Sequence, residues 1–417
     1  MTTLKRELEY NDIVLATLGY VIGAGIFSVI SVATKYGKDL TWLAVFLCGI
    51  LALCTGFSFS ELSSIFNKNA GEYFFVKEAF NENLARVMGF FVLALEVIAV
   101  TTVTFGLSNY LSTILKANKI AISAVLLSIF SYINYIGIRT SVNFNNVSTI
   151  IEVFGIIAIA ITGFFTFTKK DTLGFSKSVE PLLKLDTQTM KNLLLSAAII
   201  FFSFTGFDFV IELAEETKNP EKNIPYGMLT GIVLSTILYF FLTISAVKSI
   251  GWKALSTSIT PMADVAKKLM GNHGGIIFLI IAMVSMSNTI LMGHVGSSRF
   301  LQKIAKECKL PFNLDKIDEK TRTPKNAIIA ITIVSFLSLI LGNLENSVKV
   351  TNIITLLTFF IINICAIILR EKIPDEKRKF KMPLNINNVP IPAIIGATSS
   401  LLLLVVLFND TIQPKAH

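Results

Sequence analysis

Long apolar runs separated by short polar segments dominate the chain. Each run extends for about 18 residues or more, the length a helix needs to cross the ~30 Å hydrocarbon core of a bilayer. This pattern predicts membrane-spanning helices rather than the buried helices of a soluble core. We expect eleven spans, over residues 11–33, 40–66, 84–114, 119–138, 143–168, 190–214, 224–249, 274–300, 326–342, 350–369 and 390–408.

Two of these spans carry helix-weakening residues near their middle. The first contains "YVIGAGIF" (20–27), in which Gly23 and Gly25 are one residue apart, and each glycine weakens a helix by about 1 kcal/mol relative to Ala. The sixth contains "FFSFTGFDF" (201–209), with Gly206 near its centre. Breaks at matching places five spans apart indicate either a transporter built from inverted repeats or glycines that permit close helix packing.

Composition agrees with a membrane protein. The chain is 53% hydrophobic and 16% charged, with a mean hydropathy of +0.67, which is more apolar surface than a soluble core buries. Its net charge of +9 needs no nucleic-acid partner, because basic inner loops facing anionic lipid account for most of it. The four cysteines lack metal-ligand spacing, so we expect neither a metal site nor disulfides.

The positions of basic residues predict the orientation, because short loops rich in Lys and Arg stay on the cytoplasmic side. With a cytoplasmic N-terminus, all seven arginines fall in inner segments: Arg6, Arg86, Arg139, Arg299, Arg322, Arg370 and Arg378. Five lysines in the outer 169–191 segment weaken the lysine count but not the arginine pattern. We expect a multi-pass protein of the cell membrane, whose odd number of spans places the C-terminus outside.

Four segments resemble the amino acid–polyamine–organocation (APC) permeases: "GYVIGAGIF", "SELSSIFNKNAGEYFFVKEAF", "FFSFTGFDFVIELAEETKNPEKNIP" and "SNTILMGHVGSSRFLQKIAKECKLP". The resemblance implies an all-α integral membrane protein with the leucine-transporter fold. It places two inverted five-helix repeats at about 11–168 and 190–370 within one transport core, 1–370. Residues 371–417 then form a peripheral eleventh span and a short tail. Family members commonly have a twelfth span, so its absence leaves open whether the chain is a monomer or a homodimer.

Unwinding the first span would supply donors for a substrate carboxylate. Free backbone N–H groups at the start of a half-helix, with the positive end of its dipole behind them, suit an anion, and glycine lets the ligand approach the backbone closely. Carbonyls freed in the sixth span suit an ammonium group. The resemblance implies the same roles. The expected substrate-binding residues are Ile22, Gly23, Ala24, Gly25 and Ile26 on the first span, and Phe202, Ser203, Thr205, Gly206 and Phe207 on the sixth.

An aromatic residue of the sixth span is expected to act as a lid. Phe202, Phe204 and Phe207 are the candidates, and the position of Phe202 resembles that of a gating aromatic in some family members. With 33 phenylalanines in the chain, most face lipid or core. On an α-helix, Asp208 and Glu212 would lie one turn apart on the same face. Asp208 is a candidate for proton coupling or contact with a basic side chain, and Glu212 is expected to be solvated near the cytoplasmic end.

Three further polar residues are candidates for ion coupling or for the side-chain pocket, because ionisable groups inside a membrane are costly. Glu96 in the third span could border the pocket. Glu152 occupies a fifth-span position where some relatives have a lysine, whose ammonium group can substitute for a bound sodium ion. A carboxylate cannot play that part, so the lysine mechanism does not carry over. Glu152 could instead take up a proton, pair with a cation or form structural hydrogen bonds. Asn288, with neighbouring serines, offers oxygens for sodium, although serines in membrane helices often bond to their own backbone.

The sequence therefore predicts a secondary active transporter of amino acids or related amines, working by alternating access and either proton-coupled or exchanging. A non-transporting amino-acid receptor with the same fold is the alternative. A channel is disfavoured because no filter-like sequence or ring of charges is present. Phosphate-binding loops, metal clusters and nucleophile motifs are also absent from the sequence, so we expect no enzymatic activity and no cofactor.

Overall fold

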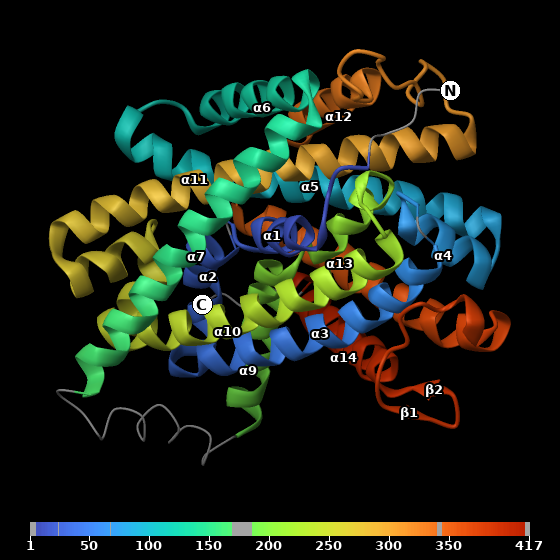
Figure 1. Ribbon diagram of the computed structural model, residues 1–417. Coiled ribbons are helices and arrows are strands. Elements are labelled where there is room, and N and C mark those ends of the chain that lie inside the picture. Colours follow the sequence, from blue (N-terminus) through green and yellow to red (C-terminus); the bar gives the residue numbers. More distant parts are fainter. Residues whose placement is uncertain (1–5, 24, 67, 169–185, 340–343, 413–417) are drawn as a thin grey trace.

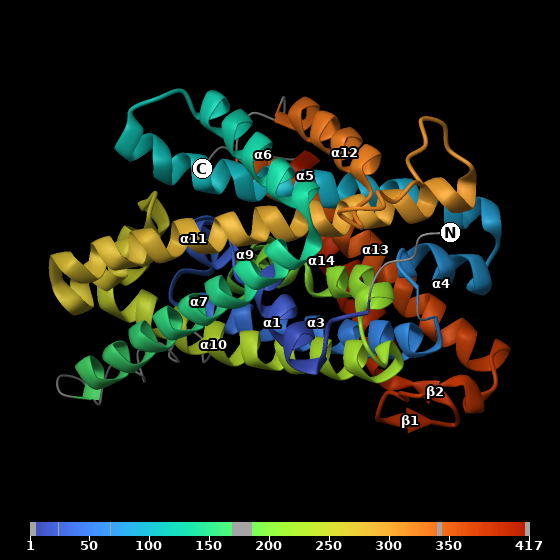
Figure 2. The same cartoon turned by 45° about the horizontal axis from the view of Figure 1, so that its top comes forward.

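The computed structural model describes residues 6–23, 25–66, 68–168, 186–339 and 344–412. Over these residues the protein is an all-α bundle with one short hairpin (Figures 1 and 2). The longer helices are α1 (Tyr10–Val21), α2 (Ile30–Gly37), α3 (Thr41–Ile65), α4 (Gly71–Ala79), α5 (Glu82–Leu115), α6 (Lys119–Ile136), α7 (Ile138–Thr168), α9 (Thr187–Ile200), α10 (Pro220–Thr257), α11 (Pro261–Cys308), α12 (Lys325–Ser338), α13 (Leu344–Lys372) and α14 (Ile391–Ile412).

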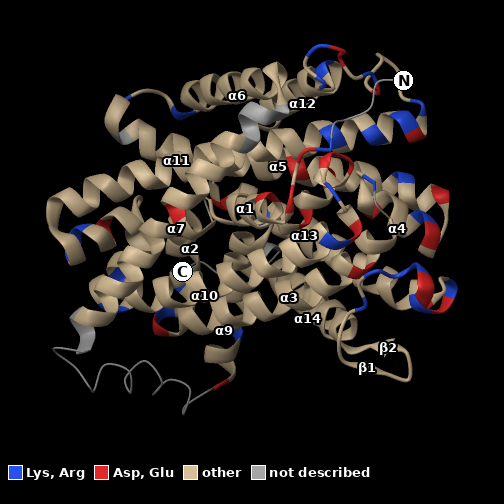
Figure 3. Cartoon of the chain, viewed as in Figure 1, with Lys and Arg blue, Asp and Glu red and all other residues tan. Residues whose placement is uncertain are grey.

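Helices occupy each of the eleven ranges expected to span the membrane. Within the described residues, nine helical stretches are long and apolar enough to cross a bilayer, and one of them, Tyr10–Ile65, contains the first two expected spans. α12 is apolar but shorter, with 14 residues. The expectation of an all-α membrane protein is confirmed. Charged residues gather toward the end of the bundle that carries α4 and the hairpin (Figure 3).

Polar caps and glycines account for several helix boundaries. The Asn81 side chain accepts a hydrogen bond from the Leu84 N–H at the start of α5, and Asn118 does the same for the first turn of α6. Such caps satisfy N–H groups that have no partner within the helix. α11 extends beyond the expected span 274–300. It begins at Pro261 and contains one non-helical residue, Gly271, at a kink.

The first span is interrupted where the glycines predict. α1 ends at Val21, and Ile22 has extended backbone angles of φ −77° and ψ 108°. The chain resumes as a short π-helix, η1 (Gly25–Val29), which leads into α2. Ala24 lies outside the described residues. The predicted discontinuity of this span is therefore confirmed.

The sixth span is also interrupted at the predicted residue. After α9 comes a short 3₁₀ helix, η3 (Phe201–Phe204), and then an extended Thr205. Gly206 has φ +100°, a left-handed conformation that glycine adopts without steric cost. A ten-residue 3₁₀ helix, η4 (Phe207–Glu216), completes the span, which is long for a 3₁₀ helix.

The two interrupted spans lie side by side in the interior of the bundle. α1 packs against η4, and η1 packs against η3. α3, α5, α10, α11 and α13 enclose them, whereas α6 and α12 lie together at the periphery (Figure 1). The antiparallel hairpin β1 (Asn385–Ile386) and β2 (Val389–Pro390) connects α13 to α14. This arrangement brings the two helix breaks together at the centre of the molecule.

Candidate functional site

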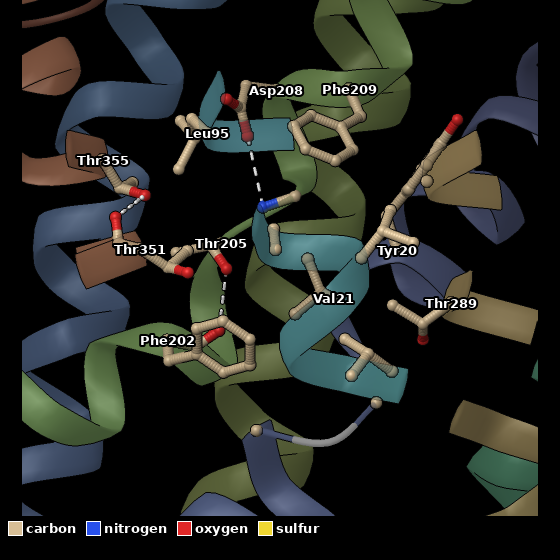
Figure 4. Close-up of a pocket in the computed structure, with 17 residues that line it drawn as sticks. Tyr20, Val21, Leu95, Phe202, Thr205, Asp208, Phe209, Thr289, Thr351 and Thr355 are labelled. Carbon is tan, nitrogen blue, oxygen red and sulfur yellow. Dashed lines mark hydrogen bonds between the residues drawn. The ribbon is translucent and has the colours of Figure 1, made fainter. Parts of the chain in front are cut away.

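A small cavity lies where the two breaks face each other (Figure 4). Its volume is about 30 Å³, more than the ~10–15 Å³ that one buried water requires. The lining residues come from the first break, α5, the sixth break, α11 and α13: Tyr20, Val21, Gly23, Gly25, Leu95, Ala99, Val100, Val103, Phe202, Thr205, Gly206, Asp208, Phe209, Thr289, Gly293, Thr351 and Thr355.

The first break leaves backbone donors free beside this cavity. The Ile22 carbonyl is already engaged, because it accepts hydrogen bonds from the Ser285 hydroxyl at 3.1 Å and the Thr289 hydroxyl at 3.0 Å. In contrast, the N–H groups of Gly25 and Ile26 have no acceptor among the described residues. These N–H groups open a half-helix, so they combine free donors with the positive end of a dipole.

The sixth break has the opposite polarity. The Gly206 N–H donates to Asp208 Oδ1 at 3.2 Å, so a carboxylate of the chain already occupies the donor (Figure 4). The Phe202 carbonyl accepts from both the N–H and the hydroxyl of Thr205, at 3.3 and 2.9 Å. The Ser203 carbonyl has no donor among the described residues. This break therefore offers acceptors and a carboxylate, which suit a cationic group.

Close backbone contact between the breaks leaves no room for larger side chains. A Cβ atom at Gly25 would collide with the backbone and side chain of Ser203. At Gly206, a Cβ atom would lie 3.1 Å from the Tyr20 carbonyl oxygen. Gly206 also has a positive φ that other residues rarely adopt. The two glycines thus set the separation of the two broken helices.

Six of the residues expected to bind substrate or couple ions line the cavity: Gly23, Gly25, Phe202, Thr205, Gly206 and Asp208. Ile22, Ile26 and Ser203 are buried beside it without lining it. Phe207 points elsewhere and packs against Phe59 and Phe359, with ring centroids 5.9 and 5.2 Å away. Of the three candidate lid aromatics, the structure places only Phe202 at the cavity.

Several lining residues do not stand out in the sequence. Phe209 and Tyr20 contact each other edge to face at 5.5 Å on the opposite side of the break from Phe202 (Figure 4). Thr351 and Thr355, spaced one turn apart on α13, place two hydroxyls on one face, but Asn352, Thr358 and Asn363 of the same span are polar too, so the pair is not distinctive. The apolar lining residues of α5 gave no signal, because apolar residues occur on every face of that span.

Glu152 and Asn288 lie behind the first break rather than in the cavity. Both are fully buried. The two carboxylate oxygens of Glu152 and Oδ1 of Asn288 have no hydrogen-bond partner among the described residues. The Asn288 amide nitrogen donates to Asn145 Oδ1 at 3.1 Å. Ser287 bonds to the Met283 carbonyl of its own helix, the backbone bond weighed as the alternative to a sodium ligand.

Glu96 is buried next to the cavity, and one of its oxygens also has no partner among the described residues. It follows the lining residue Leu95 on α5 but does not line the cavity itself. Glu96 on α5 and Glu152 on α7 are therefore two separate buried carboxylates with oxygens that have no hydrogen-bond partner among the described residues.

The expectation that Glu212 is solvated is wrong. Its side chain is buried and accepts two hydrogen bonds from the Ala70 N–H, at 2.9 and 2.8 Å. The cause is the 3₁₀ winding of η4. With about three residues per turn, positions four apart differ by roughly 120°, so Glu212 turns toward α4 while Asp208 faces the cavity.

Arg299 also differs from expectation, because it lies inside α11 rather than in an inner loop. It is fully buried and pairs with Glu216 at 3.0 Å. Removing one partner of such a buried pair costs about 3–5 kcal/mol. Arg299 therefore stabilises helix packing. It is not the inner-loop arginine expected from the positions of basic residues.

Comparison with known proteins identifies the family. A sequence model of the family described as amino acid permeases matches residues 8–417. The chain belongs to this amino acid permease family. The resemblance to the APC superfamily is thereby confirmed, and the chain is a transporter rather than an enzyme. Family membership does not favour the receptor alternative.

Curated relatives of this permease have related but varied names. It is 28% identical to the branched-chain amino acid permease BcaP of Bacillus subtilis (strain 168), over 91% of this chain and 84% of the relative. It is 27% identical to the methylthioribose transporter of the same organism, over 95% and 87%. It is 24% identical to the human (Homo sapiens) cystine/glutamate transporter, over 98% and 81%. The permease is thus a multi-pass membrane protein and secondary transporter of amino acids.

Proposed function

We propose that this permease binds its substrate between the two helix breaks and carries it by alternating access. The substrate carboxylate is held by the N–H groups that begin η1, and the α-ammonium by carbonyls of the sixth break together with Asp208. The observation that carries the proposal is the opposite polarity of the facing breaks, with free donors on one side and free acceptors on the other. An α-amino acid presents the complementary pair of charges.

The remaining cavity wall suits a compact apolar side chain. Leu95, Ala99, Val100 and Val103 of α5 form this wall. Phe202 lies over one end of the cavity and is the lid in this proposal. Among the described residues that line the cavity, only Asp208 has a carboxylate, so a charged substrate side chain would find no further counter-ion there. The name of the branched-chain relative supports the same substrate class.

Transport is coupled to protons or proceeds by exchange, with Glu152 as the coupling group in the first case. Its carboxylate is buried without a hydrogen-bond partner among the described residues. A buried unpaired charge is very costly, so the group either binds a proton or pairs with a cation. Asp208, in the sixth break itself, and Glu96, on α5, are the competing candidates.

The larger arrangement remains part of the proposal. Spans 1–5 and 6–10 form inverted repeats of one core, 1–370, with α14 peripheral to it. The N-terminus is cytoplasmic and the C-terminus outside, in the cell membrane, and the protein is a monomer or a homodimer. The matching positions of the two breaks, each in the first span of its repeat, support the repeat assignment.

Counterflow in proteoliposomes tests the transport mechanism. Vesicles preloaded with unlabelled leucine or isoleucine should accumulate the labelled amino acid transiently, whereas lysine-loaded vesicles should not. A receptor would bind label without accumulating it. Accumulation driven by lysine but not by leucine would contradict the proposed side-chain pocket while leaving transport intact.

Glu152→Gln tests the coupling proposal. The amide keeps the size of the side chain but cannot take up a proton. We expect uptake driven by an imposed pH gradient to be lost while counterflow persists. Glu96→Gln is the matched variant, because it neutralises a second buried carboxylate of the same bundle. Unchanged gradient-driven uptake in Glu152→Gln would assign this residue a structural role.

A further inference from the structure

The hairpin between α13 and α14 presents an unusual set of apolar side chains. Its two-residue turn, Asn387–Asn388, has φ values of +48° and +66°, the geometry of tight hairpin turns that asparagine tolerates. Leu384 also has a positive φ, of +58°. A left-handed conformation costs a leucine about 1–2 kcal/mol, so surrounding contacts must hold this residue in place.

These apolar side chains remain exposed. Leu384 is 72% exposed, Ile386 63% and Val389 40%. The hairpin projects sideways from the bundle beside α14 in both Figure 1 and Figure 2. Three adjacent large apolar residues on one small projection are costly in water, since each would gain about 1.5–3 kcal/mol from burial.

The base of the hairpin is fixed rigidly to the bundle. Glu61 of α3 accepts hydrogen bonds from Arg370 at 2.6 Å, Arg378 at 3.1 Å and the Met382 N–H at 2.9 Å. Phe380 stacks on Phe57, with ring centroids 6.4 Å apart. These contacts hold the residues that precede the exposed segment, and α14 follows it directly, so its projection is a built feature of the fold.

The chain geometry limits how far the hairpin can lie from the membrane. α14, one of the candidate membrane spans, begins at Ile391. Ile386 precedes it by five residues, and five extended residues reach at most about 18 Å. Because the strands fold back on each other, the real separation is smaller. The hairpin is therefore close enough to the start of α14 to reach the boundary between headgroups and acyl chains.

Exposed lysines precede the apolar residues, in a segment that also carries exposed Glu371, Asp375 and Glu376. Lys377 and Lys379 are exposed, and neither forms an ion pair among the described residues. Lys381 is exposed and pairs with Asp375 at 2.6 Å. Basic residues near a membrane surface are attracted to anionic lipid by about 1 kcal/mol each. Apolar residues flanked by lysines are typical of interfacial anchors.

We propose that the 384–390 hairpin inserts its apolar side chains into the headgroup–acyl boundary of an anionic bilayer, with Lys377 and Lys379 contacting the headgroups. It is a lipid-binding surface of this permease, separate from the substrate cavity. It fixes the ends of α13 and α14 at one face of the membrane. Its existence does not depend on the identity of the substrate or of the coupling ion.

Depth-dependent fluorescence quenching tests this proposal. Ile386→Trp is placed in a background in which both native tryptophans are replaced, Trp42→Phe and Trp252→Phe. The protein is reconstituted into nanodiscs of phosphatidylglycerol and phosphatidylcholine, with or without bromine on the upper acyl chains. We expect blue-shifted emission and loss of most of the fluorescence in brominated lipid.

Glu319→Trp, on an exposed charged segment, is the matched control. Its emission should be water-like and unquenched. If Ile386→Trp behaves like this control, the hairpin lies in water and the proposal is overturned. Blue-shifted emission without quenching by bromine would also overturn it, because another protein or a second copy would then cover the hairpin.

A charge-reversal pair tests the lipid class. Lys377→Glu with Lys379→Glu should lower the quenching of Ile386→Trp in the anionic nanodiscs to the level found in pure phosphatidylcholine. The control pair, Lys316→Glu with Lys320→Glu, makes the same charge change on the segment before α12 and should leave quenching unchanged. Equal quenching in anionic and zwitterionic lipid for the unreversed protein would overturn the proposed contact with anionic headgroups.

Discussion

The two broken helices differ in the backbone groups that they leave free. At the first break, hydroxyls from α11 engage the Ile22 carbonyl and leave the N–H groups of Gly25 and Ile26 available. At the sixth break, Asp208 engages the Gly206 N–H at the turn, and the Ser203 carbonyl stays available. Two breaks that look alike in sequence are thus chemically opposite.

The difference shows how a helix break acquires a polarity. Interrupting a helix frees donors and acceptors together, and neighbouring side chains then decide which set remains for a ligand. At one break, the hydroxyls of Ser285 and Thr289 donate to the Ile22 carbonyl. At the other, the carboxylate of Asp208 accepts from the Gly206 N–H. The facing breaks therefore present a dipolar site without any fixed charge at the first break.

The largest expected effect comes from filling the first break. Gly25→Leu would place a side chain where even a Cβ collides with Ser203, and it would cover both free N–H groups. Losing two hydrogen bonds to a charged group, at about 1.5–3 kcal/mol each, corresponds to binding at least about 100-fold weaker. Substrate-induced thermal stabilisation and uptake in proteoliposomes measure the loss.

Gly56→Leu is the control for Gly25→Leu, because it adds the same side chain on α3 against the flexible Ile232 side chain, away from the cavity. It should retain measurable binding. Normal affinity in a correctly inserted Gly25→Leu protein would contradict the assignment of the carboxylate to the first break.

At the sixth break, Gly206→Ala should lower uptake by about 5- to 30-fold, because a positive φ costs a non-glycine residue about 1–2 kcal/mol and relieving that strain would reshape the backbone that lines the cavity. The added Cβ would also lie 3.1 Å from the Tyr20 carbonyl oxygen. Gly251→Ala carries a similar strain, with φ +78° and open space around it, and should transport normally. Equal uptake by the two variants would show that the Gly206 contact is dispensable.

The proposed polarity can be tested in the unmodified protein with substrate analogues. A decarboxylated amine and an amino acid with a blocked amino group each lack one charged hydrogen-bonding group. Each should therefore compete for the site with an affinity at least about 10-fold lower than that of the parent amino acid. Competition against labelled substrate measures this. If the amine competes as well as the amino acid, the first break does not bind the carboxylate.

The smallest effect is expected for Asp208→Asn. The amide oxygen can still accept from the Gly206 N–H, so the backbone geometry is kept while the charge is lost. A charged hydrogen bond is worth about 0.5–1.5 kcal/mol more than a neutral one, which predicts substrate affinity about 2- to 10-fold lower. Asp208→Ala would remove the acceptor as well. If it binds no worse than Asp208→Asn, the bond to Gly206 contributes little.

Individual residues show how far local patterns carry the prediction. Gly23, Gly25 and Gly206 stand out within apolar runs, so the residues alone are enough to place both breaks. Phe207 was a candidate lid and Phe209 was not, yet Phe209 lines the cavity while Phe207 packs against Phe59 and Phe359. Residues two apart face different sides of a helix, and which side of η4 meets the cavity depends on the helices packed around it.

The sequence by itself determined the class of protein, the approximate spans and the two points of interruption, because hydropathy and glycine placement act locally along the chain. Only the tertiary structure decided what each break offers. The hydroxyls that engage Ile22 come from residues more than 260 positions away on α11, and Arg299 became a buried partner of Glu216 rather than a loop residue. Polarity and pairing depend on which helices are neighbours, and local sequence patterns do not encode that.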